Sequence, residues 1–123
     1  MKRMVVVLFA FVMTAASLAA GEKKLMHCFA FTTIDSASSA DWDAFKKATD
    51  QLPGKVPGLT HVWYGKLRRP LNAQSPRTYG VCMEFKDEAA LKTYADHAGH
   101  KDWQAAYEKV RQPGTTTFDI LGE

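Results

Sequence analysis

The 123-residue sequence has few cysteines, little excess charge and no long apolar run, and each shortage excludes a class of protein. Two cysteines are too few for a disulfide-scaffold mini-protein or for a four-cysteine zinc site. The formal net charge of +3, from 16 basic and 13 acidic side chains, is too small by itself to indicate a nucleic-acid partner. No metal-ligand spacing such as His-Glu-x-x-His is present, so we expect neither a metal nor a cofactor. One small globular domain remains.

The N-terminus has the pattern of a secretory signal. Lys2 and Arg3 precede an apolar run over 4–13, and small residues follow to Ala20. The run is too short for a membrane span, which needs about 20 apolar residues. We predict a cleavable signal peptide over 1–19, a mature domain over 20–123, export to the periplasm or beyond, and no stable membrane insertion after cleavage. An uncleaved anchor is the alternative.

Hydrophobic periodicity predicts the elements of the mature chain. Alternating residues indicate strands over 25–33, 59–67, 78–85 and 115–121, with a loop over 68–77. Apolar residues three and four apart indicate a helix of about three turns that is capped within 36–39 and that Pro53-Gly54 ends. They also indicate a helix after Asp87 that Gly99 ends, and a helical piece over about 101–110. The order β-α-β-β-α-β predicts an α+β, ferredoxin-like fold with a four-stranded antiparallel sheet.

Helices on one side leave the other sheet face open. In the first strand His27, Phe29 and Phe31 alternate with Met26, Cys28 and Ala30. The second set is apolar, and we expect Val62 or its neighbours and Leu121 to join it. An open apolar face predicts a second copy packed face to face, which gives a homodimeric α+β barrel.

The two cysteines lie in strands that neighbour each other in this fold. Cys28 and Cys82 are both expected on the dimer side. An exported protein can oxidise such a pair, whereas two small buried apolar side chains are the simpler interpretation and the one we favour.

The candidate site lies around the segment that contains Tyr94, His97 and His100. Tyr94 and His97 are neighbours on a helix, and a turn at Gly99 would direct His100 away from it. If His27 faces the helices, then His27, Tyr94 and His100 converge, with Phe45, Trp103 and Phe118 or Ile120 as the apolar wall. A neutral imidazole and a phenol suit acid–base chemistry beside an apolar ligand, although packing and capping roles remain open.

These residues resemble a known family, the stress-responsive A/B barrel (Dabb) domains. The resemblance rests on Tyr94-x-x-His97-x-x-His100 after Glu84-Phe85-Lys86-Asp87-Glu88, on His27, on the turn over 56–59 and on Phe118-Asp119-Ile120. It covers about residues 25–121 and implies a dimeric ferredoxin-like barrel. Ala98 stands where the family usually has proline.

The resemblance extends distantly to olivetolic acid cyclase, a polyketide cyclase, and implies roles for single residues. Tyr94 would hold a carbonyl oxygen and His100 would remove an α-proton, with His27 as the strand histidine and Phe45 in the pocket. Phe29, Phe31, Phe45, His97 and Trp103 are the expected ligand-binding residues.

Three functions stay open at this stage. The preferred one is a homodimer that binds a small, partly apolar molecule, because an exported domain would not meet thioester-linked polyketides. The alternatives are an enzyme, either a cyclase-like lyase or a cofactor-free monooxygenase, and a structural stress-related domain that pairs only with itself.

Overall fold

A computed structural model describes residues 23–123, so the predicted signal peptide over 1–19 lies outside the described residues. The elements are listed here in chain order: β1 (Leu25–Thr33), α1 (Ser39–Lys55), β2 (Leu59–Leu71), β3 (Arg77–Phe85), α2 (Glu88–Asp96), α3 (Ala98–Tyr107) and β4 (Arg111–Leu121). None of the helices in the described range is both long and apolar enough to cross a membrane.

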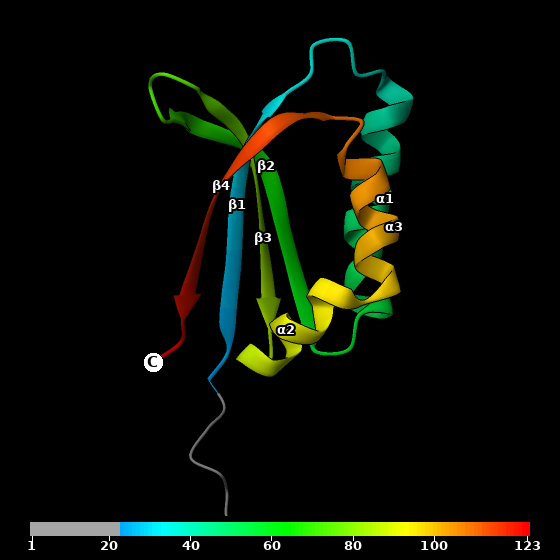
Figure 1. The fold of residues 1–123 in the computed structure, drawn as a ribbon, viewed down its shortest axis with the longest axis vertical. Coiled ribbons are helices and arrows are strands. Elements are labelled where there is room, and N and C mark those ends of the chain that lie inside the picture. The colour runs from blue at the N-terminus through cyan, green and yellow to red at the C-terminus, as the bar shows by residue number, and fades with distance from the viewer. Residues whose placement is uncertain (1–22) are drawn as a thin grey trace, which may run out of the picture.

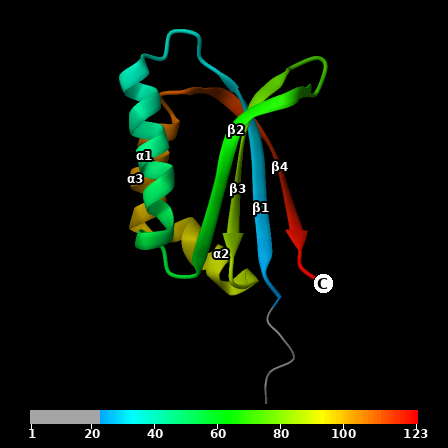
Figure 2. The same cartoon turned by 180° about the vertical axis from the view of Figure 1, so that it is seen from behind.

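The four strands form one antiparallel sheet in the order β2-β3-β1-β4. All three helices lie on one side of it, with α1 and α3 side by side (Figure 1), and the view from behind shows the other side without a covering layer (Figure 2). The predicted ferredoxin-like βαββαβ fold is confirmed, with the second crossover divided into α2 and α3.

Helix α1 begins and continues for identifiable reasons. The Ser38 hydroxyl accepts from the Asp41 N–H, and the Asp41 carboxylate accepts from the Ser38 N–H, which is a capping box. The prediction that Pro53-Gly54 ends this helix is wrong, because the helix continues to Lys55. Leu52 and Val56, on either side of the proline, are each 1% exposed, so burial of both side chains holds the last turn together.

The β2–β3 hairpin is longer than predicted. The expected loop over 68–77 shortens to 72–76, where Asn72 adopts φ +64°, and the hairpin tip projects away from the helices (Figure 1). The Leu67 side chain covers Gly80, where a Cβ atom would lie 2.9 Å from Leu67 Cδ2. Strand β4 likewise starts earlier than predicted, at Arg111, because the chain pairs with Thr33 beyond a bulge.

The break between α2 and α3 also differs from the prediction. The helix ends before His97, which has extended φ/ψ angles, and Gly99 lies inside α3 rather than at the end of α2. A Cβ atom at position 99 would lie 3.0 Å from the His97 ring and 3.2 Å from Val56. Glycine is therefore needed here for close packing rather than to end a helix.

The sheet has a buried inner face and a partly exposed outer face. As predicted, Phe29 and Phe31 face the helices, where they join the aromatic core, and Cys28 and Ala30 face outward. Trp63, Cys82, Cys28 and Phe118 form a row straight across the outer face, one from each strand. Trp63 is 75% exposed and Phe118 is 48% exposed.

Three residues of β4 were assigned to the wrong face. On β2, where Val62 or a neighbour was expected on the outer face, the neighbour Trp63 faces outward and Val62 packs against the core. Leu121 is paired with the core residue Leu25, so it faces the helices. Phe118 and Ile120 have the opposite parity and lie on the outer face, so neither is a wall of the helix-side cavity. A strand of period two with apolar residues on both faces does not reveal which set is inside.

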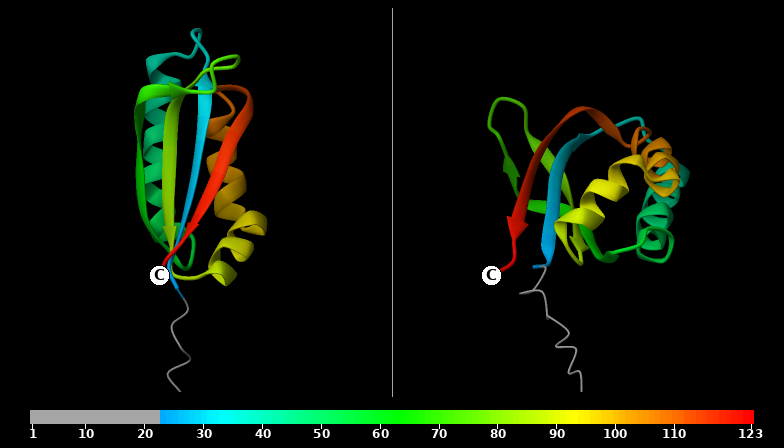
Figure 3. Two further views of the ribbon diagram at one scale, coloured as in Figure 1. Left: turned by 90° about the vertical axis from the view of Figure 1, so that its left-hand side faces the viewer. Right: turned by 60° about the horizontal axis from the view of Figure 1, so that its bottom comes forward.

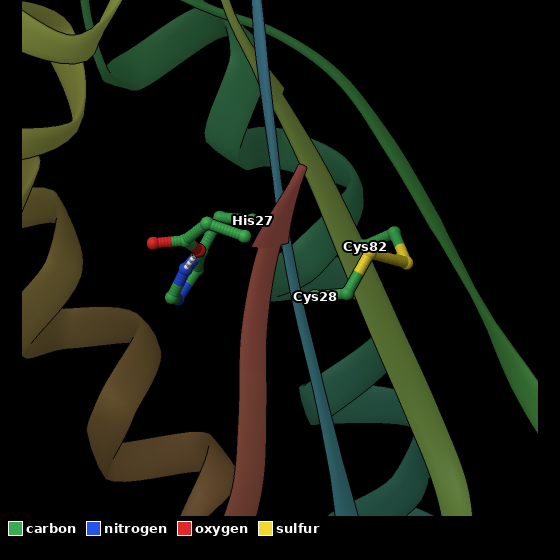
Figure 4. The surroundings of a disulfide bond; sticks show 4 residues. His27, Cys28 and Cys82 are labelled. Carbon is green, nitrogen blue, oxygen red and sulfur yellow. Dashed lines mark hydrogen bonds and ion pairs between the residues drawn. A yellow bond between two sulfur atoms is a disulfide. The ribbon is translucent and has the colours of Figure 1, made fainter. Parts of the chain in front are cut away.

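Cys28 and Cys82 are directly opposite each other on β1 and β3, with their Cα atoms 4.1 Å apart, and they form a disulfide. The favoured interpretation as two unlinked apolar side chains is therefore wrong. Figure 4 shows that this disulfide and His27 project from opposite sides of β1. The cross-link lies at the centre of the outer face, and the histidine points toward the helices.

Candidate functional site

A cavity of about 160 Å³ lies between β1, β4 and the helices α2 and α3. Figure 3 shows these elements from two further directions, with α2 and α3 on the inner side of β1 and β4. The residues that line the cavity are His27, Phe29, Tyr94, His100, Tyr107, Thr115 and Thr117. The structure thus brings together the three residues that the sequence analysis proposed as catalytic.

Tyr94 supplies a buried hydroxyl to this cavity. It comes from α2, whose N-terminus is capped by the Asp87 carboxylate accepting from the Ala90 N–H. The side chain is 4% exposed, and its hydroxyl has no hydrogen-bond partner among the described residues. Burial raises the pKa of Tyr94 well above its ordinary value. The phenol is therefore neutral throughout the physiological pH range and has a hydrogen bond to donate.

His100 lies against Tyr94, with ring centroids 4.4 Å apart. Its Nδ1 atom is 3.1 Å from the carbonyl oxygen of Ala95. A carbonyl only accepts hydrogen bonds, so Nδ1 carries the proton in this pairing and Nε2 keeps the lone pair in the neutral ring. Trp103 also stacks with His100, with ring centroids 6.0 Å apart and an interplanar angle of 17°. Two aromatic contacts and one hydrogen bond thus hold the ring, with one nitrogen left to act as a base.

His27 is held in the same way by a residue that the sequence analysis did not select. Asp119 lies opposite His27 on β4, and its Oδ1 atom is 2.5 Å from Nδ1 of His27. The carboxylate accepts from Nδ1, which leaves Nε2 as the proton acceptor in the neutral ring. The signal for Asp119 was an acidic residue between two apolar ones in a strand, but only the register of β1 and β4 shows its partner.

Four predicted ligand-binding residues do not line this cavity. Phe31 and Phe45 are both 0% exposed and belong to the aromatic core behind it. Trp103 supports His100 from behind, and its Nε1 donates to Thr49 Oγ1 at 2.9 Å. His97 caps α3, where its Nδ1 accepts from the Gly99 N–H at 2.9 Å. Of the predicted ligand-binding set, Phe29 lines the cavity.

The polar groups around the cavity include two imidazoles, two phenols and the hydroxyls of Thr115 and Thr117. Within residues 23–123, no three His, Cys, Asp or Glu side chains lie close enough together to hold a metal ion. The arrangement offers two neutral phenols, Tyr94 and Tyr107, and two imidazoles with defined tautomers around one small cavity.

Comparison with known proteins identifies the fold family. The family model described as "Stress responsive A/B Barrel Domain" matches residues 25–120, which is most of the chain. No curated protein matches the chain significantly.

Several solved structures share the fold. A dimeric ferredoxin-like protein of unknown function from Jannaschia sp. CCS1 is 24% identical, with a TM-score of 0.60, over 79% of this chain and 97% of that chain. A Dabb family protein from Mesorhizobium loti is 22% identical, with a TM-score of 0.59, over 82% of this chain and 98% of that chain. A hydroxynitrile lyase from Passiflora edulis is 10% identical, with a TM-score of 0.67, over 83% of this chain and 95% of that chain.

Proposed function

The chain belongs to the stress responsive A/B barrel domain family, and from that premise we propose that it binds a small, partly apolar carbonyl compound in the cavity of Tyr94, His27 and His100. The size of the cavity supports a small ligand. A volume of about 160 Å³ lies below the roughly 300–1,000 Å³ that is typical of sites for drug-sized ligands. This favours a compact molecule of few heavy atoms over an extended chain.

The observation that carries the proposal is the unpartnered hydroxyl of Tyr94. Leaving a buried hydroxyl without a hydrogen bond costs about 1–3 kcal/mol, so a ligand that accepts this bond would gain from it. A carbonyl oxygen in the cavity would accept this hydrogen bond. The rings of Phe29 and Tyr107, which also line the cavity, would contact the apolar part of the ligand.

A thermal-shift screen of small ketones, aldehydes and phenols tests the proposal. We expect at least one compound to raise the Tm of the wild-type protein, and Tyr94→Phe to abolish that shift. Tyr64→Phe is the matched control, because the Tyr64 hydroxyl donates to Asp50 away from the cavity. If the shift persists in Tyr94→Phe, or is lost equally in both variants, the proposed site is wrong.

Acid–base catalysis on the same ligand is the second candidate, and the two imidazoles that line the cavity favour it. Nε2 of His100 would take a proton from the carbon next to the carbonyl, while the Tyr94 hydroxyl would stabilise the developing oxyanion. This step needs no cofactor, because the proton can return to the same carbon. A lyase of the cyclase type is the reaction class that such a step serves.

Exchange of ligand protons with solvent measures this step directly. A small enolisable ketone such as acetone, incubated with the protein in D₂O, should gain deuterium faster than in buffer. His100→Gln should remove the acceleration, whereas His61→Gln, an exposed histidine on β2, should not. Acceleration that survives His100→Gln would exclude this histidine as the base.

The protein is also proposed to be a homodimer joined through the outer face of its sheet. Solved relatives are described as dimeric, and Trp63, Phe118 and Ile120 leave a large apolar area exposed on the single chain. Sedimentation should show a dimer, and Trp63→Glu should give a monomer. Ala44→Glu, an exposed change on α1, should leave the dimer intact. A wild-type monomer at micromolar concentration would contradict this assembly.

Export through a cleaved N-terminal signal is the remaining part of the proposal. It is supported by the charged, apolar and small-residue order of 1–19 and by the Cys28–Cys82 disulfide, which is stable in oxidising compartments. Expression of the full chain in a bacterium, followed by N-terminal sequencing of the periplasmic fraction, should give a start at Ala20. Uncleaved protein in the cytoplasm would refute export.

A further inference from the structure

A second and larger cavity, of about 540 Å³, lies at the other end of the helix layer. It is located where β1 leads into α1, beside β2 and the start of β3 (Figure 1). Its lining residues are Thr33, Ile34, Asp35, Ala37, Trp42, Lys46, Lys66, Thr78 and Tyr79. None of them lines the Tyr94 cavity. The volume is within the range of small-molecule sites, about 300–1,000 Å³.

The floor of this second cavity is aromatic. Trp42 and Tyr79 have ring centroids 5.0 Å apart and are tilted by 42°. Tyr79 is only 7% exposed, while Trp42 is half-buried, so their rings offer apolar surface on one side of the cavity. Such a surface suits a flat ring, because aromatic rings gain from stacked and edge contacts beyond the burial of area.

The rim of the cavity is positively charged. Lys46 comes from α1 and Lys66 from β2, and neither forms an ion pair with a described residue. Asp35 is the one acidic side chain in the lining, so the two lysines leave one net positive charge. The two lysines can therefore pair with an anionic group of a ligand.

Thr78, a residue of the cavity lining, carries a buried hydroxyl. Thr78 Oγ1 is shielded from solvent and has no hydrogen-bond partner among the described residues. It can donate to an oxygen of a ligand that enters the cavity. A carboxylate has two such oxygens, so one can accept from the hydroxyl while the other approaches a lysine.

We propose that this cavity is a binding site for a small aromatic monocarboxylate, independent of the Tyr94 cavity. The ring would lie on Trp42 and Tyr79, and the carboxylate would face Lys46, Lys66 and Thr78. The core residue Phe31 contacts Tyr79 at 5.3 Å and Tyr107 at 5.0 Å, so aromatic core packing lies between the two cavities. Occupation of one does not require the other.

Benzoate is the probe, and the indole N–H signals of the three tryptophans in a ¹H–¹⁵N spectrum report where it binds. The Trp42 signal, assigned with Trp42→Phe, should move saturably as benzoate is added. The Trp103 signal, whose N–H is bonded to Thr49 inside the core, should stay in place and confirm that the protein is folded. Tyr94→Phe should not alter this titration.

Charge is tested with a neutral ligand and with lysine variants. Benzyl alcohol should bind at least about tenfold more weakly than benzoate. The double variant Lys46→Met/Lys66→Met should lower the affinity for benzoate by about tenfold, which is the effect of losing one modest charge interaction. Lys47→Met, on the same helix but outside the cavity, is the matched control and should bind benzoate as the wild type does. Equal binding of the neutral ligand, unchanged affinity in the double variant, or a benzoate response at Trp103 instead of Trp42 would each overturn the proposal.

Discussion

Removing the Cys28–Cys82 disulfide should cost the folded protein a large share of its stability. The two cysteines are 54 residues apart in sequence, so the cross-link prevents the unfolded chain from opening a long loop. For a loop of this length the chain-entropy relation gives about 4 kcal/mol at 25 °C. Domains of this size unfold with a total free energy of roughly 5–15 kcal/mol. Loss of the cross-link should therefore bring the protein close to marginal stability.

The assay is urea unfolding of the wild type with and without a thiol reductant, beside Cys28→Ala/Cys82→Ala under both conditions. The wild type should lose about 3–4 kcal/mol on reduction, whereas the double variant should not respond to reductant. Comparing reduced wild type with the variant separates the cross-link from the packing of the two sulfur atoms. A reductant effect under about 1 kcal/mol, with the bond shown by mass to be broken, would refute the entropic reasoning.

Three further predictions concern buried polar groups. Burial raises the pKa of all four tyrosines, and that of Tyr64 to about 12. The tyrosines of the unfolded chain ionise near pH 10, before those of the folded protein, so a rise in pH above 10 stabilises the unfolded chain relative to the folded protein. Stability should be fully present below pH 10 and fall above it, with the absorbance of tyrosinate delayed beyond pH 10; normal titration at pH 10 in the folded protein would contradict this. Tyr94→Phe should leave the free energy of unfolding unchanged or raise it, because the hydroxyl has no partner to lose. Thr49→Val should cost about 1–3 kcal/mol in urea unfolding, because it leaves the Trp103 N–H unpaired, whereas Thr93→Val on the exposed side of α2 should cost less.

Periodicity carried most of the fold prediction. The alternation in β1 separated His27, Phe29 and Phe31 from the residues of the opposite face, and the spacing of Phe45, Thr49 and Leu52 identified the buried side of α1. Those patterns are reliable because one face of each element must be covered. The convergence of His27, Tyr94 and His100 followed from the same topology together with the family resemblance.

Features that depend on tertiary pairing could not be predicted in this way. Burial of Leu52 and Val56 extends α1 past Pro53, although proline and glycine locally favour an end. The position of His97 at a helix cap depends on a break that Gly99 marks only approximately. An error of two residues in the position of this break is enough to place His97 at the cap instead of in the cavity.

The pairing of strands accounts for two further features that the sequence analysis missed, the disulfide and the contact between His27 and Asp119. Cys28 and Cys82 were predicted to be neighbours, but only their directly opposed positions on β1 and β3 bring the sulfur atoms within bonding distance. His27 and Asp119 are 92 residues apart and meet for the same reason on the opposite face. A single sequence gives the alternation within a strand but not the register between strands.

The histidine ring signals in a long-range ¹H–¹⁵N spectrum test the proposed site most directly. The chain has four histidines, and two of them, His27 and His100, line the Tyr94 cavity while His61 and His97 lie elsewhere. On addition of a carbonyl compound found in the thermal-shift screen, the ring nitrogens of His27 and His100 should shift together and saturate, and those of His61 and His97 should remain unchanged. Shifts at His61 or His97, or saturable binding that leaves His27 and His100 unmoved, would contradict a binding site between the sheet and the helices.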